Sequence, residues 1–99
     1  MKKLLLAVAI GALSVTSFAQ GKDLKVAIDP TYEPFTFKTA DGTPTGFDVD
    51  IANALCTELK RKCVFVEQVW DSMIPGLMAR KYDVIISSMS ITEDRLKQV

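Results

Sequence analysis

The chain has 99 residues, with 12 Lys and Arg against 12 Asp and Glu, no His and 2 Cys, so it has room for one globular domain at most. The balanced charge excludes a strongly basic nucleic-acid-binding protein, and the 48% apolar content excludes a disordered or collagen-like chain. Because His is absent, triads with a histidine base and metal sites built on imidazole are excluded too, and we expect neither metal nor cofactor.

The first 19 residues have the layout of a secretory signal peptide. Two lysines precede the apolar run 4–13, LLLAVAIGAL, and small residues occupy positions 17 and 19. A membrane anchor or a core helix is the weaker interpretation, because the apolar run is shorter than the ~20 residues of a spanning helix. We therefore expect export and cleavage, which leave a soluble protein without a membrane anchor, with 10 basic and 12 acidic side chains.

The two cysteines predict a disulfide bond. Export places Cys56 and Cys63 in an oxidising compartment, where an even number of thiols at short spacing is typical of a structural bridge. The spacing does not match a redox motif, and two cysteines without histidine make a poor zinc site. Two buried free thiols are the alternative.

The first half of the mature chain predicts a strand, a hairpin and a helix. Residues 24–28, LKVAI, form a β-like run that ends before Pro30, and residues 35–38 are expected to pair with 44–47 across a turn. From Asp48, which we expect to cap it, a helix runs to the basic residues 60–62. The apolar face of this helix is expected to contain Val49, Ala52, Leu55, Cys56 and Leu59.

Two more pairs of strand and helix follow. Residues 63–67 predict a buried strand, and Asp71 is expected to cap a helix over residues 72–81. Residues 83–86 predict a third strand, which leads through a polar loop to a helix at Thr92. Strands that alternate with helices predict an α/β fold with a mostly parallel sheet flanked by helices.

Polar and aromatic side chains follow three of the predicted strands. They are Asp29 and Tyr32 after the first strand, Trp70 after the second, and Ser87, Ser88, Ser90 and Arg95 after the third. These loops lie along the sheet edge where ligands bind in open α/β folds, so we expect a crevice that holds a small zwitterion. Arg95 and Ser90 suit its carboxylate, and Asp29 suits a distal cation.

Four of these side chains also have a purely structural interpretation. The acids at 93–94 would neutralise Arg95 on a solvated surface, with Ser90 opening a capping box. Asp29, before a proline, is a common turn residue, and an aromatic beside a helix start, such as Trp70, is often packing. The spacing alone leaves these alternatives open.

Four features resemble the periplasmic polar amino-acid-binding proteins of ABC importers, which form solute-binding protein family 3. They are residues 29–35 (DPTYEPF), residues 46–52 (GFDVDIA), the pair of cysteines, and residues 87–95 (SSMSITEDR). The match covers residues 24–99 in the same order, and it is nearest to the lysine/arginine/ornithine and histidine binders. It implies a lobe of the periplasmic-binding-protein type II fold.

The resemblance also implies a function without catalysis or cofactor. A monomeric periplasmic protein of this family captures a basic L-amino acid and delivers it to an ABC permease in the inner membrane. Carried over to this sequence, Arg95 clamps the α-carboxylate, while Ser88 and Ser90 help to hold the α-ammonium and carboxylate groups.

The side-chain end of the ligand is assigned in the same way. Asp29 and Ser87 would meet it, and Tyr32 would cover its alkyl stem. Trp70 stands where relatives carry leucine or phenylalanine, so the resemblance does not fix which basic amino acid is preferred.

Relatives continue into a second lobe, whereas this chain stops within a predicted helix. We therefore expect residues 20–99 to be the N-terminal part of lobe 1, and to bind a basic amino acid weakly without the rest. Two other functions remain as alternatives. One is an enzyme like cyclohexadienyl dehydratase, with Asp29 or Glu33 as proton donor, and the other is a small exported disulfide module that binds a protein. The pair Asp48 and Asp50 would suit a two-carboxylate hydrolase, but capping explains Asp48 without chemistry.

Overall fold

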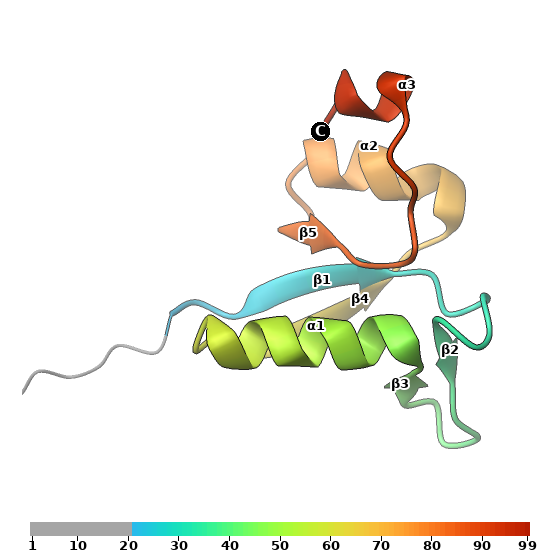
Figure 1. The fold of residues 1–99 in the computed structure, drawn as a ribbon, viewed down its shortest axis with the longest axis vertical. Coiled ribbons are helices and arrows are strands. Elements are labelled where there is room, and N and C mark those ends of the chain that lie inside the picture. Colours follow the sequence, from blue (N-terminus) through green and yellow to red (C-terminus); the bar gives the residue numbers. More distant parts are fainter. Residues whose placement is uncertain (1–20) are drawn as a thin grey trace, which may run out of the picture.

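The computed structural model describes residues 21–99, so the predicted signal peptide lies outside the described residues. In chain order the elements are β1 (Leu24–Ile28), β2 (Phe37–Lys38), β3 (Pro44–Thr45), α1 (Phe47–Glu58), β4 (Cys63–Glu67), the 3-10 helix η1 (Trp70–Ser72), α2 (Met73–Met78), β5 (Val84–Ile85) and α3 (Glu93–Leu96). Strands β4, β1 and β5 form a parallel sheet in that order, and β2 pairs with β3 as an antiparallel hairpin (Figure 1). The predicted α/β class is confirmed.

Strand β1 lies at the centre of the sheet and is covered on both faces. Val26 and Ile28 pack with Ala52 and Cys56 in the core next to α1, while Ala27 packs against Met73 of α2 on the opposite face. Figure 1 shows α1 on one side of β1, with α2 and α3 on the other. This arrangement explains why LKVAI is almost continuously apolar, since parallel strands between helices bury both faces.

Helix α1 begins one residue before its predicted start, and Asp48 does not cap it. The N-cap is Gly46, which makes no side-chain hydrogen bond and has φ 114°. A Cβ at Gly46 would lie 2.5 Å from the backbone oxygen of Phe35, so only glycine lets the helix start this close to that segment. Asp48 lies in the first turn instead, and its backbone N–H donates to Phe35 O at 2.8 Å.

Two apolar residues that we expected in the core, Leu55 and Leu59, are exposed. Val49, Ala52 and Cys56 face the sheet as predicted. The exposed apolar side chains recur every fourth residue along a neighbouring stripe, at Phe47, Ile51, Leu55 and Leu59. A helical period alone does not separate these two stripes, because they lie next to each other on the helix surface.

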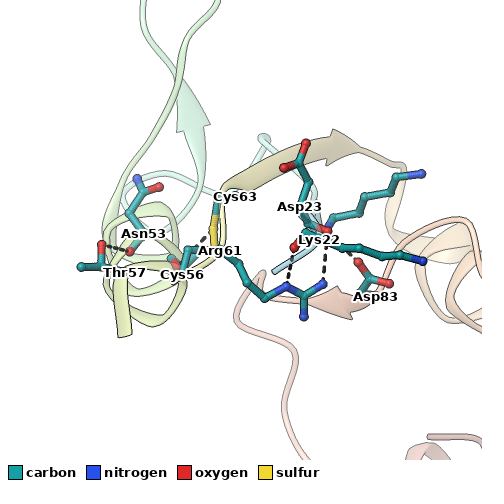
Figure 2. The surroundings of a disulfide bond; sticks show 10 residues. Lys22, Asp23, Asn53, Cys56, Thr57, Arg61, Cys63 and Asp83 are labelled. Carbon is teal, nitrogen blue, oxygen red and sulfur yellow. Dashed lines mark hydrogen bonds between the residues drawn. A yellow bond between two sulfur atoms is a disulfide. The ribbon is translucent and has the colours of Figure 1, made fainter. Parts of the chain in front are cut away.

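The basic run after α1 does not form the end of the helix. The helix ends at Glu58, with Leu59 as its C-cap, and Lys60 turns the chain with φ 53°. Arg61 points away from the helix end and donates from Nε to Lys22 O and from Nη2 to Asp23 O, at 2.5 and 3.2 Å. Figure 2 shows these two bonds, which tie the start of β1 to the turn before β4.

The disulfide between Cys56 and Cys63 is present, as predicted (Figure 2). It joins the last turn of α1 to the first residue of β4, and the Cys56 side chain is itself part of the core. The two cysteines of the chain are therefore both used, and neither is a free thiol.

The helix predicted over residues 72–81 is shorter and starts without the expected cap. The chain forms η1 and then α2, which ends at Met78, and no side-chain bond from Asp71 or Ser72 caps either helix. Tyr82 fills the space beside Gly76, where a Cβ would collide with its hydroxyl group. That hydroxyl donates to Met73 O, and burial raises the pKa of Tyr82.

The last strand and helix agree with the prediction in place but not in length. β5 comprises two residues, and α3 follows Thr92, whose side chain accepts from the Arg95 N–H at 3.2 Å. Thr92 is therefore the N-cap of α3. The alternative prediction, a capping box that begins at Ser90, is wrong. Within residues 21–99 we find no helix with the length and apolar character to cross a membrane.

We expect Gly46→Ala to destabilise the protein by about 3 kcal/mol or more, because the new Cβ meets the Phe35 carbonyl and the φ angle is unfavourable for alanine. Gly42→Ala is the matched control. Gly42 also has positive φ but has open space around it, so its variant should lose only about 1–2 kcal/mol. Urea unfolding measures both values, and equal losses would show that the contact with Phe35 is unimportant.

Replacing both cysteines by alanine should lower the free energy of unfolding by about 2.5 kcal/mol, plus the loss of sulfur packing around Cys56. The estimate follows from the eight-residue loop that the bridge closes in the unfolded chain. Urea unfolding of the oxidised protein and of the double variant tests it. Identical midpoints would mean that the bridge contributes nothing to stability.

Candidate functional site

Three loops leave the parallel sheet at the same edge. Ile28 at the end of β1 pairs with Glu67 at the end of β4, and Ala27 pairs with Ile85 at the end of β5. Because the three strands end at nearly the same level, the residues that follow them come together. A hydrogen bond from the Asp29 N–H to Ser87 Oγ, at 3.0 Å, ties two of these loops directly.

A pocket of about 390 Å³ lies at this edge. It is lined by Asp29, Thr31, Tyr32, Trp70, Ser87 and Ser88. All of these except Thr31 were predicted from the sequence, so residues from three separate loops converge as expected. Thr31 was missed, although its position between two predicted site residues was a usable signal.

Asp29 combines a turn role with a free acceptor. The Thr31 hydroxyl donates to its Oδ1 at 2.7 Å, which is the local turn bond that the alternative interpretation expected. Within residues 21–99, no hydrogen bond reaches the second carboxylate oxygen. A half-buried carboxylate in the pocket wall thus keeps an acceptor for a cation.

Two aromatic rings contribute to the pocket. Tyr32 and Trp70 remain 54% and 39% exposed, so neither ring is used up in core packing. The ring of Tyr32 packs next to that of Phe35, with ring centroids 5.1 Å apart. Exposed aromatic faces beside a carboxylate suit a ligand with an alkyl stem and a cationic end.

Arg95 and Ser90 do not line this pocket. They border a second hollow, of about 320 Å³, where residues of α2, β5 and α3 meet. The two regions are joined by Trp70, since the Arg95 Cζ atom lies 5.6 Å from the centroid of the Trp70 ring. This distance is typical of a cation–π contact, so the guanidinium is stacked against a residue of the pocket wall.

The guanidinium of Arg95 is held but not neutralised. Nη1 donates to both the backbone oxygen and Oγ of Ser90, at 2.8 and 2.9 Å. Within the described part of the chain, no ion pair joins Arg95 to the acids at 93–94, and Asp94 pairs with Lys97. The Nε and Nη2 groups have no protein acceptor there, which leaves one edge of the fork for a carboxylate.

Asp48 has a role that the sequence did not reveal. Its side chain is 5% exposed and accepts from the Thr36 hydroxyl at 2.7 Å and from Ser88 Oγ at 2.9 and 2.8 Å. Ser88 has φ 54°, an uncommon conformation for a residue with a side chain. Asp50 is exposed, so the two acids do not form a paired carboxylate site.

One of the two proton donors considered for an enzyme lines the pocket. Among the described residues that line it, Asp29 is the one carboxylate, whereas Glu33 is exposed and does not line it. In the part of the chain that the structure covers, no three His, Cys, Asp or Glu side chains cluster as metal ligands would. The chemistry present is a carboxylate, hydroxyls, aromatic faces and a nearby guanidinium.

Comparison with known proteins identifies the family of this chain. Residues 24–99 match the family described as bacterial extracellular solute-binding proteins, family 3. The chain belongs to this family. Its fold is thus that of part of a periplasmic binding protein, as the resemblance in the sequence predicted.

Similar proteins are named as binding proteins. An L-arginine-binding protein of Pseudomonas aeruginosa is 50% identical over 101 residues, which cover 100% of this chain and 39% of that protein. A histidine-binding periplasmic protein of Escherichia coli is 40% identical over 103 residues, which cover 100% of this chain and 40% of that protein. The chain therefore spans 39–40% of the length of these curated relatives.

One similar solved structure is a single domain. It is a point mutant of the arginine-bound form of domain 1 from TmArgBP, the arginine-binding protein of T. maritima. It has a TM-score of 0.73 and 42% sequence identity, and the match covers 78% of this chain and 59% of that one.

Proposed function

We propose that this chain is part of a periplasmic binding protein that captures a basic L-amino acid, arginine first among them, and delivers it to an ABC permease. In this proposal residues 1–19 are the signal peptide and residues 20–99 are the N-terminal part of lobe 1. Membership of the solute-binding family supports the transport role, and the names of the arginine- and histidine-binding relatives support a basic ligand.

The observation that carries the ligand class is that two groups of opposite charge both lie near Trp70. Asp29 lies in the pocket whose wall Trp70 forms, and the guanidinium of Arg95 stacks on the same ring. The open edge of Arg95 suits an α-carboxylate, and the free oxygen of Asp29 suits a distal cation. Tyr32 and Trp70 suit the alkyl stem between the two ends of the ligand.

The solved domain 1 bears on whether one lobe is enough. We expected residues 20–99 to bind weakly without a second lobe, because half of a cleft leaves one side of the ligand in water. The arginine-bound form of domain 1 from TmArgBP supports a role for lobe 1 in holding the ligand, and the match covers 59% of that domain. We therefore infer that the residues of lobe 1 supply a large share of the binding free energy.

Asp29→Asn should weaken L-arginine binding about tenfold or more, because a hydrogen bond to a charged partner contributes about 1.5–3 kcal/mol. The affinity for L-citrulline, the neutral isostere of arginine, should fall less than about twofold, since the asparagine amide can still bond the ureido group of citrulline. Isothermal titration calorimetry of the purified protein with both ligands measures the two ratios. Asp23→Asn, which removes an exposed carboxylate outside the pocket, is the matched control.

Three outcomes would contradict the proposal. They are tighter binding of glutamate or leucine than of any basic amino acid, an equal loss of arginine and citrulline binding in Asp29→Asn, and consumption of the ligand during the titration. The last result would favour the dehydratase alternative. Binding of a protein partner that no amino acid affects would favour the small interaction module.

A further inference from the structure

We propose that Asp48 is a positioning residue that orients the Ser88 hydroxyl, so that Ser88 can only accept a hydrogen bond and thereby binds the α-ammonium group of the ligand. The inference rests on the proposed function, because it assigns one end of the amino acid to one side chain of the same pocket. It concerns a residue that does not itself line that pocket.

Asp48 is built into the protein interior by three separate segments. It lies in the first turn of α1, the Thr36 hydroxyl reaches it from the residue before β2, and Ser88 reaches it from the loop after β5. Thr36 is fully buried and Asp48 is 5% exposed. Water therefore has little access to this carboxylate, and protein hydroxyl groups satisfy it.

The chemistry of a carboxylate fixes the direction of both bonds. An ionised Asp has no hydrogen to give, so Thr36 and Ser88 must each donate their hydroxyl hydrogen to it. A serine has a single hydroxyl hydrogen, and that of Ser88 is shared between the two oxygens of Asp48, at 2.9 and 2.8 Å. Only the lone pairs of Ser88 Oγ remain for a ligand, and lone pairs call for an N–H donor.

The neighbouring serines have the opposite polarity. Ser87 Oγ accepts from the Asp29 N–H at 3.0 Å, and Ser90 Oγ accepts from Arg95 Nη1 at 2.9 Å. Each of these hydroxyl groups keeps its hydrogen, and that of Ser90, beside Arg95, can be donated to a carboxylate oxygen of the ligand. The α-carboxylate is therefore suited to Ser90 and Arg95, and the α-ammonium group to Ser88.

The test replaces Asp48 by asparagine, which has the same shape but carries an NH₂ group. That group can donate to Ser88 Oγ, which frees the serine hydrogen to point at the ligand's ammonium group, where it repels. We expect Asp48→Asn to lower the affinity for L-arginine at least about tenfold, as measured by calorimetry. The affinity for the desamino analogue of L-arginine, which lacks the α-ammonium group, should change less than about twofold.

Two further variants separate orientation from stability. Thr36→Val removes the other donor to the same carboxylate and leaves the contact between Ser88 and Asp48, so it should lower the melting temperature without changing the ratio of the two affinities. Ser88→Ala should weaken the binding of L-arginine more than that of its desamino analogue. Adding Asp48→Asn to Ser88→Ala should then cause no further selective loss, because the hydroxyl that Asp48 orients is gone.

The results distinguish this inference from the proposed function. If the unmodified protein binds neither arginine nor another basic amino acid, the proposed function fails. If it binds arginine but Asp48→Asn weakens both ligands equally, Asp48 is only structural and the inference is overturned. Should Asp48→Asn not fold, Ser88→Ala still tests the inference. Equal loss of affinity for both ligands overturns it, and selective loss of affinity for arginine supports the contact between Ser88 and the α-ammonium group on which it depends.

Discussion

The position of every candidate ligand-binding residue depends on three parallel strands that end at the same level. Their buried faces are held between α1 and α2, so the register of the sheet is fixed by apolar packing on both sides. The side chains of the site follow three different strands, and neighbouring members such as Trp70 and Ser87 are still 17 residues apart in sequence. They converge because the strands that carry them end at one edge of the sheet. The sheet fixes where the loops lie, and the loops carry the polar and aromatic side chains of the site.

The features that sequence reasoning predicted correctly are those with a local signal. The run 24–28 is almost wholly apolar and ends at a proline, so its strand was predicted with the observed bounds. The cysteine pair needed only an even count and an oxidising compartment. The convergence of Asp29, Trp70 and Ser88 followed from the alternation of strands and helices, because that alternation determines which loops share an edge.

The features that sequence reasoning did not predict depend on tertiary contacts. Asp48 looks like a helix cap in sequence, but its carboxylate is turned inward to Thr36 and Ser88, which lie 12 and 40 residues away. Leu55 has the spacing of a core residue and is exposed, because the sheet meets the adjacent stripe of α1. The stacking of Arg95 on Trp70 likewise joins two separate elements, α3 and η1, and no pattern within either element encodes it.

The proposed function depends on the orientation of one dipolar ligand beside Trp70. A crystal structure of the protein grown with L-arginine tests it most directly. We expect the α-carboxylate against the open Nε and Nη2 edge of Arg95, the α-ammonium group against Ser88 Oγ, and the ligand guanidinium at the free oxygen of Asp29. Arginine bound in the reverse direction, or outside the pocket that contains Asp29, would contradict the account.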